Sequence, residues 1–211
     1  MGPTAIADDA CGLTRPRETG WRASLAGGLL STRLDLGAPR VDLVQWSTVA
    51  SAARRLSRKV TVQVGAGALL GGRLEVGERT FALDPGAVAT AVATVLVADG
   101  RGAWPFVSAT LALAHARTST ADGAPYRATD LSLSVAAGRS LGGWVAPYVG
   151  AKVFGGPVTW RLDGEALTGS DVHHYGLAIG AAFALPARFD LLVEGVPLGA
   201  RGATLSLGRA F

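Results

Sequence analysis

The residues of this chain with the clearest potential for acid–base chemistry are Asp171, His173 and His174, which lie within four positions of one another. A carboxylate that orients an imidazole can produce a general base, so the segment is a candidate hydrolytic site. Adjacent residues of a strand point to opposite faces, however, so the two histidines cannot both serve one site. No serine motif accompanies them. We therefore predict that the protein is not an enzyme and keep a rim-located hydrolase as the lesser alternative.

Metal and cofactor sites are not predicted. The spacing of His115, His173 and His174 matches no ligand pattern. The glycine-rich run GAGALLGG, residues 65–72, lacks the Lys-Ser/Thr pair of a phosphate-binding loop and continues a strand pattern. The single cysteine, Cys11, has no partner for an internal disulfide.

A second group of candidates consists of charged residues on the polar side of segments in which polar and apolar residues alternate. Its members are Arg22, Arg55, Lys59, Asp130, Lys152, Asp190 and Glu194. If this side lines a narrow interior, opposite charges there should pair. Lys152 and Glu194 lie on alternate strands and could meet across the strand between them. We favour a structural plug of ion pairs and hydroxyls, and the alternative is a gated polar pathway for small solutes.

The elements that position these residues are predicted from a period of two. Residues 59–72 place Val60, Val62, Val64 and Leu70 on one side, with polar residues or glycine on the other. The same alternation recurs along the chain in short segments bounded by turn residues. These segments span residues 21–30, 43–56, 59–72, 86–98, 105–116, 129–138, 144–156, 173–185, 189–199 and 202–211. Residues 43–57 also fit a helical stripe, so strand and helix both remain open there.

The apolar side of these strands could face either a protein core or lipid. Hydrophobic residues make up 49% of the 211 residues and charged residues only 17%, below the soluble norm of about 25%. No uncharged stretch reaches the ~18 apolar residues of a membrane helix. Connections alternate between short links and longer ones at residues 72–86, 117–128 and 157–172, as in membrane barrels.

The predicted fold class is therefore all-β, a closed antiparallel up-and-down transmembrane β-barrel of about ten strands, with eight as the alternative. Residues 1–20 lack periodicity and are predicted to be a disordered tail, and residues 21–211 form the barrel domain. The rival interpretation is a soluble, lipocalin-like barrel that binds an apolar ligand. The net charge of +4 does not indicate nucleic-acid binding, because the arginines form no stripe interleaved with aromatic residues.

The last ten residues, GATLSLGRAF, place Leu205, Leu207 and the final Phe211 on one side of a strand. This pattern resembles the C-terminal β-signal of bacterial outer-membrane barrels, and the chain is similar to the small OmpA/OmpX-like class. Arg209 departs from the apolar residue usual at its position, and snorkelling would accommodate it. The resemblance implies export to the outer membrane, contact with its lipid and recognition by the barrel-assembly machinery. No signal peptide is found, and the implied role is structural, adhesive or that of a narrow pore.

Overall fold

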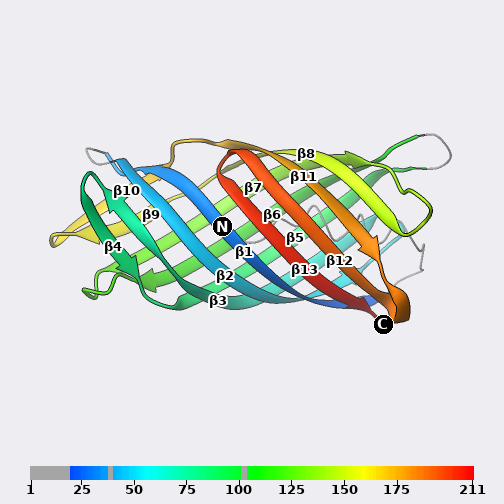
Figure 1. Cartoon of the computed structure of the whole chain (residues 1–211), viewed down its shortest axis with the longest axis horizontal. Coiled ribbons are helices and arrows are strands. Elements are labelled where there is room, and N and C mark those ends of the chain that lie inside the picture. Colours follow the sequence, from blue (N-terminus) through cyan, green and yellow to red (C-terminus); the bar gives the residue numbers. More distant parts are fainter. Residues whose placement is uncertain (1–19, 38–39, 101–103) are drawn as a thin grey trace.

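The computed structural model describes residues 20–37, 40–100 and 104–211. Ten strands form one closed antiparallel ring, seen from the side in Figure 1. In ring order they are β1 (Trp21–Asp35), β2 (Arg40–Arg55), β3 (Val60–Val76), β5 (Gly86–Asp99), β6 (Phe106–Ser119), β7 (Pro125–Gly138), β8 (Val145–Gly155), β11 (Tyr175–Ala184), β12 (Phe189–Gly199) and β13 (Arg201–Ala210). The predicted fold class and strand number are confirmed.

The ring closes where the last strand pairs with the first. β1 and β13 pair in continuous register from Arg22–Ala210 to Ser31–Arg201. The ambiguous segment 43–57 is mostly strand, because β2 pairs with β1 along its whole length. Of the predicted tail, residues 1–19, with Cys11, lie outside the described residues.

Side chains alternate across the barrel wall as the period of two predicts. On β3, Val64 and Leu70 are exposed on the outside, whereas Leu69 is buried inside. On β7, Leu131 and Leu133 face outward, and the serine between them faces inward. The apolar side of the strands is therefore the outer surface of the barrel over most of its height.

The two ends of the barrel differ. At one end, here called the terminal end, Trp21 lies beside Phe211. The backbone carbonyl oxygen of Trp21 accepts a hydrogen bond from the backbone N–H of Phe211. Short connections join the strands there, and one includes the 3-10 turn η1 (Pro186–Arg188). At the opposite end, the hairpin end, three further strands lie outside the ten-stranded ring, and they are β4 (Arg79–Leu83), β9 (Val158–Leu162) and β10 (Glu165–Asp171). No helix in the described ranges is long and apolar enough to cross a bilayer.

The long connections expected at the hairpin end are built largely from strands. β4 folds back on β3, and β9 pairs with β7 and β10. β10 then reaches β1, where Leu34 pairs with Asp171. An isolated bridge between Leu83 and Thr120 joins β4 to the turn after β6. These pairings extend one side of the wall into a second ring, here called the collar, which rises beyond the ends of β8, β11, β12 and β13.

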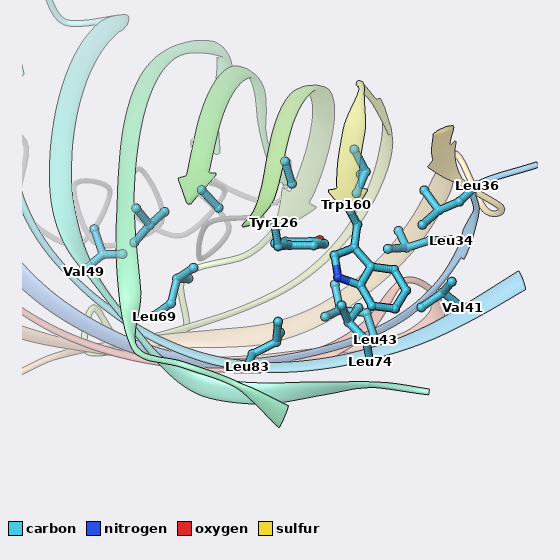
Figure 2. Close-up of a cluster of buried hydrophobic side chains, with 14 residues drawn as sticks. Leu34, Leu36, Val41, Leu43, Val49, Leu69, Leu74, Leu83, Tyr126 and Trp160 are labelled. Carbon is cyan, nitrogen blue, oxygen red and sulfur yellow. The ribbon is translucent and has the colours of Figure 1, made fainter. Parts of the chain in front are cut away.

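The interior of the collar is an apolar core, here called the hairpin-end cluster. Figure 2 shows Leu43 and Leu74 next to the Trp160 ring, with Tyr126 on one side of that ring and Leu34 on the other. The remaining buried members are Leu36, Val41, Val49, Leu69, Leu83, Val88, Ala116, Ala128 and Val158. The alternation that turns aliphatic residues outward in the ring is thus replaced, in the collar, by aliphatic residues that face inward.

Candidate functional site

The predicted interior charges include one ion pair near the terminal end. Arg22 on β1 donates from Nε to Asp190 on β12 at 2.9 Å, and its second nitrogen bonds the other carboxylate oxygen. Only 13% of the Arg22 side chain and 9% of the Asp190 side chain are exposed. Gly208 on β13 lies between the two strands, and a Cβ at that position would collide with the guanidinium. The glycine therefore leaves the space through which Arg22 reaches its partner.

Hydroxyl and amide groups line another part of the interior. The hydroxyls of Ser24 and Ser51 are 2.7 Å apart, and Gln63 Nε2 donates to Ser51 at 2.8 Å. On the neighbouring strands, Thr110 donates to Thr94 at 3.2 Å. Hydrogen-bonded hydroxyls satisfy one another without a charge, so this wall of the lumen is polar but neutral.

Four charged residues form what we call the luminal charge cluster, namely Asp130, Lys152, Asp171 and Glu194. Lys152 is close enough to the three carboxylates for attractive electrostatic interactions. Its ammonium also lies 5.0 Å from the centre of the Phe154 ring, a cation–π distance. One oxygen of each carboxylate, Oδ1 of Asp130, Oδ2 of Asp171 and Oε1 of Glu194, is buried without a hydrogen-bond partner among the described residues.

Glu194 takes its direct hydrogen bond from a residue that sequence reasoning did not single out. Tyr148 on β8 donates to Glu194 on β12 at 2.7 Å, across Gly180 of β11. A Cβ at Gly180 would lie 2.5 Å from Tyr148 Oη, so only glycine lets the ring pass. Tyr148 occupies the same side of its strand as Lys152, and alternation alone could have identified it as an interior residue.

The other predicted interior residues lie closer to the terminal end. Arg55 is half-buried at the end of β2. Lys59 is exposed in the turn that precedes β3, because the strand begins one residue later. The structure therefore brings Asp130, Lys152 and Glu194 together in one cluster and Arg22 and Asp190 in one pair, while Lys59 joins neither group.

The residues considered for hydrolysis do not assemble a catalytic pair. Asp171 is 3% exposed and accepts a hydrogen bond from the hydroxyl of Thr32 at 2.5 Å. Burial raises the pKa of its carboxyl, while the Thr32 hydroxyl opposes that shift. His173 and His174 are exposed, and His174 Nδ1 lies 3.2 Å from the Phe154 carbonyl oxygen. Within the described ranges, no three His, Cys, Asp or Glu residues are grouped to hold a metal ion.

The C-terminal strand carries the predicted signal residues on its outer face. Leu205, Leu207 and Phe211 are all exposed. The guanidinium of Arg209 lies 5.3 Å from the ring of Phe189 and 5.4 Å from that of Phe211. Arg209 therefore has an aromatic ring on β12 and another at the chain end, which accounts for a cation at a position where an apolar residue is usual.

Comparison with known proteins identifies the fold and no family. No protein-family model matches the chain, and no curated protein matches its sequence. Among solved structures, it is similar to the outer membrane protease OmpT from Escherichia coli, with 11% identity, a TM-score of 0.51, and 93% of this chain and 98% of that one covered. The translocator domain of the autotransporter NalP from Neisseria meningitidis matches with 11% identity, a TM-score of 0.54 and full coverage of both chains. The chain thus has the fold of outer-membrane β-barrels.

Proposed function

We propose that the protein is an integral barrel of a bacterial outer membrane, with its terminal end toward the periplasm and the collar outside. The observation that carries this proposal is a belt of exposed aliphatic side chains around the ring. Exposure ranges from 43% for Val95 to 63% for Val64. The belt includes Leu25, Val64, Val95, Leu111, Leu133, Val149, Ile179, Val193 and Leu205. Soluble monomeric proteins rarely expose a continuous apolar surface of this extent to water, whereas membrane barrels place such a surface against lipid.

Aromatic residues bound the belt at both ends. On β11, Tyr175 lies at the hairpin side and Phe183 at the terminal side. The strand between them rises about 27 Å, or about 20 Å along the barrel axis at the tilt usual in membrane barrels. Phe183 is half-buried, whereas Trp21, Trp144 and Phe211 are exposed at the terminal end. This spacing is close to the apolar band of about 25 Å in such proteins, and it supports a membrane location over a soluble, ligand-binding barrel.

Within that membrane, we assign the barrel a structural role, that of anchoring the collar at the outer surface. The hairpin-end cluster supports this role because apolar side chains from opposite walls, such as Trp160 and Leu74, meet inside the collar. A core of this kind obstructs a continuous water-filled path. The Arg22–Asp190 pair and the luminal charge cluster add side chains to the lumen below it.

Two measurements test the proposal. After refolding in detergent, the unheated protein should migrate differently from heated protein on a gel, and protein inserted in vesicles should keep its belt inaccessible to protease. In planar bilayers, the inserted protein should produce no discrete conductance steps. A monomer that stays soluble without detergent would contradict the membrane location, and regular steps would contradict the closed lumen.

The second candidate function is a narrow pathway for small cations. The three unpartnered carboxylate oxygens around Lys152 favour it, because buried acceptors without donors attract a cation or water. In that case the conductance steps should be cation-selective, and Glu194→Gln should reduce the selectivity. Asp84→Asn, which removes an exposed carboxylate at the hairpin end, should leave the selectivity unchanged.

A further inference from the structure

A ladder of outward-facing residue pairs on β6 and β7 changes from apolar to cationic as it approaches the collar. Successive cross-strand pairs are Leu111–Leu133, Leu113–Leu131, His115–Thr129 and Arg117–Arg127. The leucines belong to the exposed aliphatic belt. The arginine pair lies about 10 Å farther along the barrel axis than Leu113. It therefore stands just above the belt, at the level where lipid headgroups begin in the proposed membrane orientation.

The two arginines of this ladder carry like charges directly opposite each other. Both are exposed, and neither forms an ion pair with a carboxylate among the described residues. Like charges in directly opposed positions destabilise a sheet. Arg161 on β9 adds a third exposed cation, because Thr159 pairs with Arg127 and Arg161 is two residues farther along the strand, at a diagonal spacing of about 7–8 Å.

Three other outward arginines at the hairpin end do have partners. Arg33 donates to Asp42 at 2.7 Å, and Arg73 donates to Glu75 at 2.5 Å. Arg79 donates to Asp163 at 2.8 Å. The carboxylate of Asp84 accepts a hydrogen bond at 3.3 Å from the hydroxyl of Ser119, at the end of β6. Arg117 and Arg127 thus differ from these three arginines, because no carboxylate among the described residues pairs with them.

We propose that Arg117, Arg127 and Arg161 bind the phosphate of an anionic lipid in the leaflet at the hairpin end. The planar guanidinium groups match phosphate oxygens through paired hydrogen bonds. The leucine pairs below the arginines provide the apolar surface along which the acyl chains of the same lipid would lie. His115, which is 2.9 Å from the Thr129 hydroxyl, lies between the two parts. A soluble anion would use only the cationic part of this surface, whereas a lipid uses both parts.

This inference rests on the proposed membrane location, and the test separates the two. The whole protein is refolded in neutral detergent and titrated with phosphatidic acid or with phosphatidylcholine, and bound lipids are counted by native mass spectrometry. Arg117→Gln/Arg127→Gln should weaken the apparent affinity for phosphatidic acid about tenfold or more. The matched control, Arg33→Gln/Arg73→Gln, removes the same charge from arginines that already have partners and should leave the affinity unchanged.

Folding of each variant is checked by its heat-modifiable gel migration and its circular dichroism. Equal binding of phosphatidic acid and phosphatidylcholine by the wild-type protein would overturn the inference, as would an equal loss in the control. Displacement of the lipid by an equal concentration of inorganic phosphate would reassign the surface to soluble anions and also overturn it. Failure to insert into phosphatidylcholine vesicles would instead contradict the proposed function, since that step needs no anionic lipid.

Discussion

At the scale of single residues, the Arg22–Asp190 pair joins β1 to β12 across β13, next to the closure of the ring. Asp190→Asn would leave a mostly buried guanidinium without its counter-charge. Removal of one partner of a buried pair typically costs about 3–5 kcal/mol. We expect the free energy of unfolding, measured by urea titration in lipid vesicles, to fall by an amount near the lower limit, because the pair is partly exposed.

The double variant Arg22→Met/Asp190→Leu provides the control for that experiment. It removes both charges, so it should be less destabilised than Asp190→Asn alone. A double variant at least as unstable as the single variant would show that the pair is not what stabilises this part of the barrel.

The Tyr148–Glu194 hydrogen bond gives a second prediction at this scale. Tyr148→Phe keeps the ring and removes the only described hydrogen-bond donor to Glu194, whose other oxygen already has no partner. We expect a loss of about 1–3 kcal/mol in the free energy of unfolding. Tyr148→Phe combined with Glu194→Leu should restore part of this loss, because the carboxylate that lost its donor is then removed as well.

Alternation within a strand predicted which residues face the interior, and that is why Arg22, Asp130, Lys152, Asp190 and Glu194 were identified. It does not predict contacts between strands far apart in sequence, since those depend on register around the whole ring. The partner of Glu194 therefore became visible only in the structure. Lys59 lies in a turn for a local reason, because the alternation of β3 continues in sequence one residue beyond the start of the strand.

At the scale of elements, the collar depends on one aromatic residue of β9. Trp160 is 2% exposed and packs edge-on against Phe81 of β4, with ring centres 5.1 Å apart. Trp160→Ala should reduce the free energy of unfolding by about 3–5 kcal/mol, because it leaves a large cavity in the hairpin-end cluster.

Trp160→Phe tests the same position without a large cavity. The indole Nε1 of Trp160 has no hydrogen-bond partner among the described residues, so phenylalanine removes an unsatisfied donor while it keeps an aromatic ring. Its effect should be clearly smaller than that of Trp160→Ala. Equal losses for the two variants would argue against cavity formation as the cause.

The outer face of β7 provides the prediction that most directly concerns lipid. Leu133→Arg places a charge in the aliphatic belt and should cost about 2–4 kcal/mol in vesicles. Leu141→Arg is the control, because Leu141 is similarly exposed but lies in the turn at the terminal end. A similar cost at both positions would show that Leu133 does not face hydrocarbon.

The strands of the ring were predictable because each carries its own alternation, whereas the collar was not. β4, β9 and β10 are short, contain charged residues and occur where turn signals predict loops. Their stability comes from pairing with distant strands, as in Leu34–Asp171 and Tyr126–Trp160. Such contacts leave no periodic pattern in the local sequence, so residues 72–86 and 157–172 resembled ordinary loops.

At the scale of the whole molecule, an exposed ion pair links two hairpins of the collar. The Arg79 guanidinium donates two hydrogen bonds to Asp163 and holds the pKa of that carboxyl below its ordinary value of 3.8. The stabilisation is therefore complete above that value and is lost as the pH falls through the lowered pKa. Spin labels at residues 78 and 165 measure the distance between the two hairpins. This distance should become greater or more variable once the pH falls below the lowered pKa of Asp163.

If Asp163 is the group that titrates, Asp163→Asn should abolish the pH dependence of the label separation. The variant should show the same label separation at neutral and acidic pH, equal to that of the wild-type protein in acid. A variant that still changes with pH in this range would point to another carboxyl. Asp122, whose pKa is lowered by the Thr120 hydroxyl in the neighbouring turn, would be the one to examine next.

The barrel wall is taller on the side of the collar than on the side of β8, β11, β12 and β13, and this difference has a consequence for the order in which the strands fold. Every strand of the collar, from β1 to β10, precedes residue 172, whereas three of the four strands that end below it come later in the chain. A nascent chain that still lacks β11, β12 and β13 already contains all partners of Trp160 in the hairpin-end cluster. We therefore expect protection of collar amides from hydrogen exchange to begin before the seam between β1 and β13 has formed, so that the first and last strands approach one another on a scaffold that is already rigid.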